Sequence, residues 1–220
     1  MSIYIPDNKP FQAYAVIVDI NNFARAVSDA VAGFSGGQLI AQFTRDTLAS
    51  AIVGIESNEG AVVGIMGDAV LGVVPRGSHI FDTCTTVAKS VDRACEYLSI
   101  HQREFPQDWD YAPGGPSLKI CIEFGWMDVS TITTQQLGTQ KLLIGPAINY
   151  ASRIGRAGAG NRCLLGPVAA QMPDLAQYSP RGPCRVSGKA DEEDYPYYEL
   201  YLGDIWREGE RSLGDETYWG

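Results

Sequence analysis

Two aspartates are the first residues of this sequence whose type and placement could do chemistry. Asp19 ends an apolar run that starts at Ala13, and Asp68 lies in a Gly67-Asp68 dipeptide between two further apolar runs. The two carboxylates lie side by side if their strands share a sheet. Hard divalent cations prefer carboxylate oxygens, and two such ions can hold the attacking and leaving oxygens of a phosphoryl transfer. Taken singly, each aspartate also fits a structural role, as a helix cap or a turn former.

Asn149 and Arg153 form a second candidate pair. They stand four residues apart in a segment expected to be helical, so both lie on one helix face. A fixed asparagine can orient a ribose oxygen, and an arginine can donate to phosphate oxygens that gain charge in a transition state. An ordinary polar helix face would explain the pair taken alone. The combination with the two aspartates is what favours a catalytic role.

Short apolar segments predict the elements that position these residues. The run Ala13–Asp19 is rich in β-branched residues, as expected of a buried strand. The runs Ala61–Met66 and Ala69–Val74 predict a hairpin that places Asp68 at its tip. A helix is expected to follow the first strand, over residues 21–31.

The remaining pattern predicts an α+β fold, with helices on one face of a mainly antiparallel sheet. We expect one catalytic domain over residues 1–203 and a C-terminal tail over 204–220. Further helices are expected at 37–55, 80–103 and 146–156, and further strands at 118–124, 141–144, 162–165, 183–187 and 195–202.

Composition excludes several classes of function. The net charge of −9 disfavours a nucleic-acid polymer as a partner, since such partners select for clustered basic residues. Five scattered cysteines and two histidines indicate neither a disulfide framework nor a zinc site. Neither a signal segment nor a membrane-spanning apolar stretch stands out, so we expect a cytoplasmic protein with no membrane partner.

Four segments, in order along the chain, resemble the class III adenylate and guanylate cyclase family. Val18–Phe23 (VDINNF) looks like the first metal motif of the family, and Ile65–Asp68 (IMGD) looks like the second. Ile144–Arg153 (IGPAINYASR) resembles its segment of glycine, asparagine and arginine, and Val186–Lys189 (VSGK) resembles its phosphate-binding lysine segment. The likeness covers nearly the whole chain and implies the ferredoxin-like catalytic fold of that family.

The resemblance implies a two-metal site and a dimer. Asp19, Asp68 and the backbone carbonyl of Ile20 would bind two Mg²⁺ or Mn²⁺ ions. Asn149 and Arg153 would reach across a head-to-tail homodimer to complete the partner's site. The substrate would be a nucleoside triphosphate whose 3′ hydroxyl attacks the α-phosphorus.

Phosphate contacts are implied in the same way. Lys189 would hold the departing pyrophosphate, and Arg153 would stabilise charge on the α-phosphoryl group. The backbone N–H groups of Asn22 and Phe23, at a helix start, would cradle the phosphates.

The base pocket departs from the adenylate cyclase pattern. Gly64 stands where that family has a base-reading lysine, and Leu142 stands where it has an aspartate. Neither side chain can hydrogen-bond a base edge. In this respect the chain is similar to the stand-alone pyrimidine cyclases of bacterial anti-phage (Pycsar) systems, which make cyclic UMP or cyclic CMP for a separate effector protein.

We therefore predict a uridylate or cytidylate cyclase that acts in anti-phage defence. Two alternatives remain open: a cyclase that acts on ATP or GTP and reads its base through the main chain, and an inactive module that only binds nucleotide.

Overall fold

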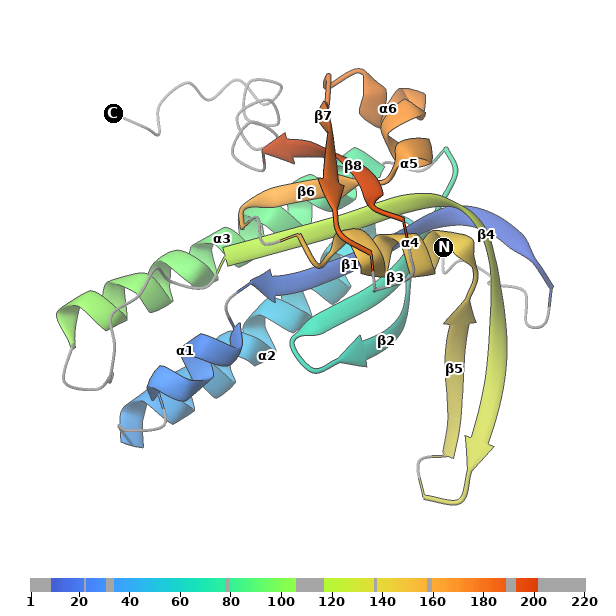
Figure 1. Cartoon of the computed structure of the whole chain (residues 1–220). Coiled ribbons are helices and arrows are strands. Elements are labelled where there is room, and N and C mark those ends of the chain that lie inside the picture. Colours follow the sequence, from blue (N-terminus) through green and yellow to red (C-terminus); the bar gives the residue numbers. More distant parts are fainter. Residues whose placement is uncertain are drawn as a thin grey trace.

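Figure 1 shows a computed structural model of the chain, which describes residues 9–21, 23–30, 34–77, 80–105, 117–136, 138–157, 160–188 and 193–201. The strands are β1 (Phe11–Asn21), β2 (Ala61–Met66), β3 (Ala69–Pro75), β4 (Ser117–Thr134), β5 (Gly138–Ile144), β6 (Arg162–Leu165), β7 (Arg181–Val186) and β8 (Tyr195–Tyr201). The helices are α1 (Phe23–Ala30), α2 (Phe34–Ser57), α3 (Ile80–Glu104), α4 (Pro146–Ile154), α5 (Pro167–Gln171) and α6 (Pro173–Ala176).

The described strands form one sheet in the order β2-β3-β1-β4-β6-β8-β7, with β5 paired to the far part of β4. All described pairs are antiparallel except β4 with β6. Strand β1 lies inside the sheet, between the hairpin strand β3 and the long central strand β4. This order places the end of β1 directly beside the β2–β3 turn.

Alternate residues of β1 pack into two separate cores, one on each face of the sheet. Tyr14 and Val16 belong to a cluster shared with α2, α3 and α5. Ala13 and Ala15 belong to a second cluster shared with α4. Because successive strand residues point to opposite faces, helices cover both faces of this sheet.

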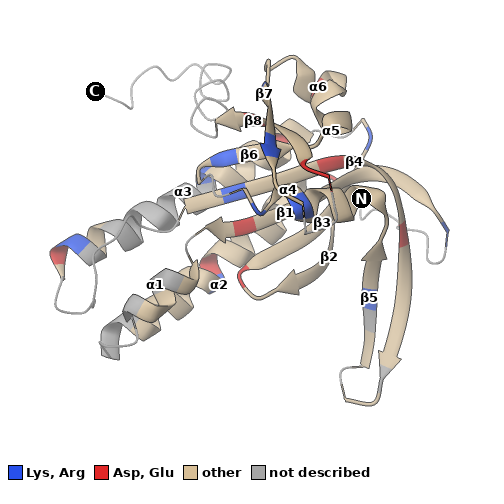
Figure 2. Ribbon diagram, in the orientation of Figure 1, with Lys and Arg blue, Asp and Glu red and all other residues tan. Residues whose placement is uncertain are grey.

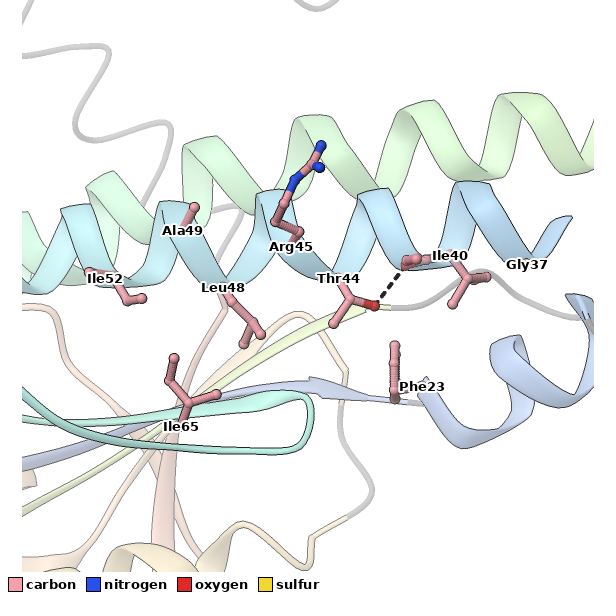
Figure 3. A pocket seen from close by; sticks show the side chains of 10 residues that line it. Phe23, Gly37, Ile40, Thr44, Arg45, Leu48, Ala49, Ile52 and Ile65 are labelled. Atoms are coloured by element: carbon pink, nitrogen blue, oxygen red, sulfur yellow. Dashed lines mark hydrogen bonds between the residues drawn. The ribbon is translucent and has the colours of Figure 1, made fainter. Parts of the chain in front are cut away.

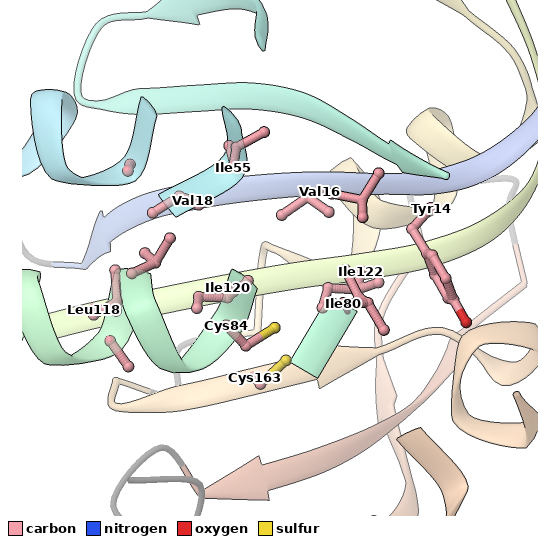
Figure 4. Packing of buried hydrophobic residues seen from close by; sticks show 14 of the residues in the cluster. Tyr14, Val16, Val18, Ile55, Ile80, Cys84, Leu118, Ile120, Ile122 and Cys163 are labelled. Atoms are coloured by element: carbon pink, nitrogen blue, oxygen red, sulfur yellow. The ribbon is translucent and has the colours of Figure 1, made fainter. Parts of the chain in front are cut away.

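The face under α2 and α3 is closed and apolar. The two helices touch so closely that a Cβ on Gly54 of α2 would collide with the side chain of Val87 of α3. Figure 4 shows the core beneath them, where the sulfur atoms of Cys84 and Cys163 point toward one another. Both cysteines are buried, which agrees with a packing role.

Strand β4 is much longer than the apolar run 118–124 from which it was predicted. Its second half pairs with β5 from Asp128 opposite Ile144 to Thr134 opposite Gly138, and the pair extends as an arm beyond the rest of the sheet (Figure 1). The arm carries exposed apolar side chains, among them Ile132 and Leu142. An exposed apolar surface of this kind commonly marks an interaction site.

The predicted α+β class is confirmed, and the sheet is mainly antiparallel as expected. The expectation of helices on one face alone is wrong, since α4 packs on the opposite face from α2 and α3. The proposed tail lies outside the described residues. Within the part of the chain that is described, no helix is long and apolar enough to cross a membrane.

Candidate functional site

Asp19 lies near the end of β1, on the face of the sheet that carries α4. It stands opposite Ala69 of β3 and opposite Lys119 of β4. Ala69 immediately follows Asp68, so the predicted neighbourhood of the two aspartates is present in the structure. Figure 2 shows these acidic positions in red at the end of β1 and at the β2–β3 turn.

Asp68 occupies the predicted turn between β2 and β3. Gly67 before it has a φ of +64°, a backbone conformation that glycine adopts without strain. Burial raises the pKa of the Asp68 carboxyl, a hydrogen bond from its own backbone lowers it, and the charge of Asp19 raises it further. The two carboxylates are therefore close enough to repel one another, and a cation held by both would relieve that repulsion.

Lys119 is a site residue that the sequence analysis missed. Its Nζ lies 3.1 Å from Oδ2 of Asp19, and its side chain is 7% exposed against 28% for the aspartate. It also acts on Asp68, whose pKa it lowers. The sequence does contain a signal for it, since Lys119 is the one lysine inside the apolar run Leu118–Phe124. A lysine buried in such a strand needs a charged partner.

The residues after Asp19 lie at the junction of β1 and α1. Ile20 is buried on the opposite face and pairs with Leu118, so its side chain joins the core, and the predicted role of its backbone carbonyl stays a prediction. Phe23 is the first residue of α1. Asn22 lies outside the described residues, so its predicted phosphate contact is not tested.

A pocket of about 600 Å³ lies beside this junction, between α1, α2 and β2 (Figure 3). Phe23 and Ile65 border it, and most of its wall is apolar, including Ile40, Leu48 and Ile52 of α2. Neither aspartate lines it. The pocket is therefore an apolar hollow separate from the two aspartates.

Gly64 and Leu142 lie on strands that contact one another, β2 and β5. Gly64 stands opposite Leu71 just after a register shift in β2, and a Cβ built on it would meet open space. Leu142 pairs with Ser130 and is 45% exposed. The structure thus brings both predicted base-pocket positions to the same side of the molecule.

Helix α4 carries Asn149 and Arg153. The helix begins after Gly145, whose φ is +151° and whose Cβ would lie 2.5 Å from the carbonyl oxygen of Trp126, so only glycine fits there. Asn149 is exposed, and the Arg153 guanidinium lies 5.9 Å from the centre of the Tyr195 ring.

The helix runs back along β4 toward the aspartates. Ala147 at its start packs near Gly125, and Gly155 just after its end packs near Cys121. Asn149 and Arg153 are therefore on the same sheet face as Asp19, while the ring contact of Arg153 lies over β8 on the other side of β4. Lys189 lies outside the described residues, so its predicted phosphate contact stays a prediction.

The acidic part of the site is small. Among the described residues, no group of three or more histidine, cysteine or acidic side chains could hold a metal ion. Asp19 and Asp68 supply two carboxylates, and hard cations take six or more oxygen ligands. A metal at this site would need further oxygens from the backbone, from water or from a bound triphosphate.

No protein-family model matches the sequence, and neither does any curated protein. Solved structures do match. The adenylyl cyclase CyaB from P. aeruginosa is 13% identical, with a TM-score of 0.63 over 88% of this chain and 95% of that one. The guanylyl cyclase Cya2 is 14% identical, with a TM-score of 0.63 over 88% and 93%.

A third match, a class III adenylyl cyclase-like ATP-binding protein from Pseudomonas aeruginosa, is 16% identical. Its TM-score is 0.67 over 94% of this chain and 41% of that one. At these identities the likeness concerns architecture. The chain has the fold of the class III adenylyl and guanylyl cyclases.

Proposed function

We propose that this protein is a nucleotide cyclase, which converts a nucleoside triphosphate to the 3′,5′-cyclic nucleotide and pyrophosphate. The observation that carries the proposal is the pair of carboxylates, Asp19 near the end of β1 and Asp68 in the neighbouring β2–β3 turn, in a fold shared with class III cyclases. In the reaction the 3′ oxygen forms a bond to the α-phosphorus, the bond from the α-phosphorus to the bridging oxygen breaks, and the 3′ proton is released.

Two divalent cations, Mg²⁺ or Mn²⁺, fit the donors of this site. Asp19, Asp68 and the Ile20 carbonyl would hold them, and the strand pairing that sets Asp19 opposite Ala69, the residue after Asp68, supports a shared cation there. When bound, such ions lower the pKa of the 3′ hydroxyl and neutralise the triphosphate.

The other chain residues bind and orient the substrate. Asn149 would hydrogen-bond the ribose, and Arg153 would donate to the α-phosphoryl oxygens as they gain charge. The backbone N–H groups of Asn22 and Phe23 and the side chain of Lys189 would bind the remaining phosphates.

A head-to-tail homodimer would complete each site. Asn149 is exposed on α4, where a second chain could reach it. Large exposed apolar side chains lie on β2, β4 and β5, and a second copy would cover them: Ile65, Met66, Trp126, Ile132, Leu142 and Ile144. Each dimer would then have two equivalent sites.

The fold neighbours support a purine triphosphate as substrate. CyaB is named an adenylyl cyclase and Cya2 a guanylyl cyclase. On this candidate, the base would be read by main-chain groups near Gly64 and Leu142, because neither side chain can donate or accept a hydrogen bond.

A second candidate substrate is UTP or CTP. The lack of a polar side chain at Gly64 and Leu142 favours it, since the side chains that read adenine in the adenylate cyclase pattern are missing at these positions. On this candidate the product would signal phage infection to a separate cyclic-nucleotide-sensing effector.

The test is product analysis by mass spectrometry after separate Mn²⁺ reactions with ATP, GTP, CTP and UTP. Cyclic AMP or cyclic GMP as the main product would support the purine candidate, and cyclic UMP or cyclic CMP would support the pyrimidine candidate. No product from any of the four would contradict the proposal and favour a nucleotide-binding module, the kind of protein named in the ATP-binding neighbour.

A further inference from the structure

Lys119 is one of the few charged residues buried in the described part of the chain, and it faces the candidate metal site. Its Nζ lies 3.1 Å from Oδ2 of Asp19, across the β1–β4 register in which the two residues are direct partners. The strand pairing leaves the lysine little freedom, because Leu118 and Ile120 on either side of it are anchored in the core of the opposite face. The ammonium group is therefore held against Asp19 by the sheet itself.

The aspartate keeps an open side in this pair. Its side chain is 28% exposed, whereas the lysine side chain is 7% exposed. A buried ion pair recovers the cost of desolvating its charges only when the geometry is good and further hydrogen bonds satisfy both groups. Here one partner faces solvent at the site where Asp68 also lies, so a ligand can reach the carboxylate while the lysine stays behind it.

We propose that Lys119 is a positioning residue that orients Asp19 and neutralises it in the absence of nucleotide, so that divalent cations bind firmly only together with the triphosphate. This inference rests on the proposed function, because Asp19 is taken to be a metal ligand.

Charge counting gives the physical reason. Asp19, Asp68 and Lys119 carry −1, −1 and +1, which sums to −1. Two divalent cations alone would bring this site to +3, and a triphosphate with about four negative charges returns it to about −1. Without the lysine, the bare carboxylate pair would attract free cations more strongly, with or without nucleotide.

A neighbouring arginine offers a matched control. Arg162 of β6 stands next to Lys119 in the β4–β6 register and carries the same charge. Its side chain is occupied elsewhere, since its Nε lies 3.7 Å from Oε2 of Glu199 and its guanidinium lies 4.5 Å from the centre of the Tyr201 ring. Removal of Arg162 changes the net charge equally but leaves the Asp19 carboxylate paired.

The experiment is titration of nucleotide-free protein with Mn²⁺, followed by the electron paramagnetic resonance signal of free Mn²⁺. Lys119→Met should bind Mn²⁺ about tenfold or more tightly than wild type, because a like charge next to the ion has been removed. Lys119→Arg and Arg162→Met should bind as weakly as wild type. The double variant Asp19→Asn/Lys119→Met should lose the increase in Mn²⁺ affinity. That loss would show that the additional binding occurs at Asp19.

Unchanged or weaker Mn²⁺ binding by folded Lys119→Met would overturn the inference. Circular dichroism checks the fold, and Lys119→Gln provides the same comparison if the methionine variant does not fold. The readout is independent of turnover. Tighter binding without any cyclic product would support the role of Lys119 and refute the proposed function; cyclic product with unchanged binding would refute the role of Lys119 alone.

Discussion

The two faces of the sheet differ in what they bury. The face under α2 and α3 buries apolar side chains and two threonines, Thr47 and Thr83. The face under α4 buries both residues of the described part that carry full charges in its interior, Lys119 and Glu123. Charge on a covered surface is costly unless it is paired, so each of these residues must have a partner.

The partners of these two charged residues of β4 differ in their exposure to solvent. Glu123 accepts hydrogen bonds from the backbone N–H groups of Phe124, at 2.7 Å, and Ala169, at 2.8 Å, inside the protein. Lys119, four residues earlier, pairs with the partly exposed side chain of Asp19. A charge satisfied by buried backbone fixes the fold, whereas a charge paired at an accessible edge remains open to a ligand.

The largest effect should be on turnover, when candidate site residues on the α4 face of the sheet are replaced. On the proposed function, Asp19→Ala and Asn149→Ala should each lower turnover by about 10²-fold or more, because each would remove a group assigned to the metal ions or the ribose. A 1:1 mixture of the two variants should recover about a quarter of wild-type activity, since half of the randomly formed dimers contain one intact site. The measurement is the rate of cyclic nucleotide formation.

Rates for each variant alone give the baseline of that mixing experiment. A mixture no more active than either variant, after gel filtration has confirmed subunit exchange, would contradict a site shared between two chains.

The second effect should be on stability, when the buried Glu123 of the same face is replaced. Glu123→Ala leaves two buried N–H groups without an acceptor and should cost about 2–4 kcal/mol of unfolding free energy. Glu123→Gln keeps an acceptor oxygen and should stay within about 1 kcal/mol of wild type. Urea unfolding followed by circular dichroism measures both, and equal losses for the two variants would argue against the hydrogen-bond explanation.

A third effect tests the apolar face. Gly54→Ala places a methyl group against Val87 and should destabilise the protein by about 1–3 kcal/mol through overpacking between α2 and α3. The control is Gly37→Ala in the same helix, where a Cβ would meet nothing within 4 Å. That variant should gain about 0.5–1 kcal/mol, because alanine favours a helix more than glycine does. Thermal melting compares the two variants with wild type. A Gly54→Ala protein as stable as wild type would contradict the close packing of α2 on α3.

The smallest effect concerns pH. Burial raises the pKa of Glu123 above its ordinary value of 4.5, against hydrogen bonds from the backbone that lower it. A raised pKa in the folded state means that the carboxyl contributes stability that is fully present below 4.5 and is lost as pH rises through the folded pKa. As pH rises from 4.5 through the folded pKa of Glu123, the unfolding free energy of wild type should therefore fall relative to that of Glu123→Gln. Urea midpoints at a series of pH values test this, and a constant difference between the two proteins would contradict it.

Local sequence patterns predict most of this fold because its central strands are short apolar runs bounded by turn residues. The Gly67-Asp68 turn and the strand before Asp19 could be placed from the sequence, and so their neighbourhood followed. The far half of β4 was not predicted. Its polar, threonine-rich residues are held by pairing with β5, a long-range contact that no local pattern reveals.

The site was predicted less completely than the fold. Lys119 has no motif of its own, and its role depends on the register that sets it opposite Asp19. The apolar face of α4 (Ala147, Ala151 and Ile154) shows that the helix packs on the sheet, but the side of the sheet that it covers depends on the path of the chain, which no local pattern reveals.

The most direct test of the account is a comparison of wild type with Asp68→Ala in the same Mn²⁺ reaction, with cyclic nucleotide and pyrophosphate both quantified. The account predicts equal molar amounts of the two products from wild type, and a loss of about 10²-fold or more of both from a variant that remains folded. Equal product from the two proteins, or pyrophosphate without cyclic nucleotide, would contradict it.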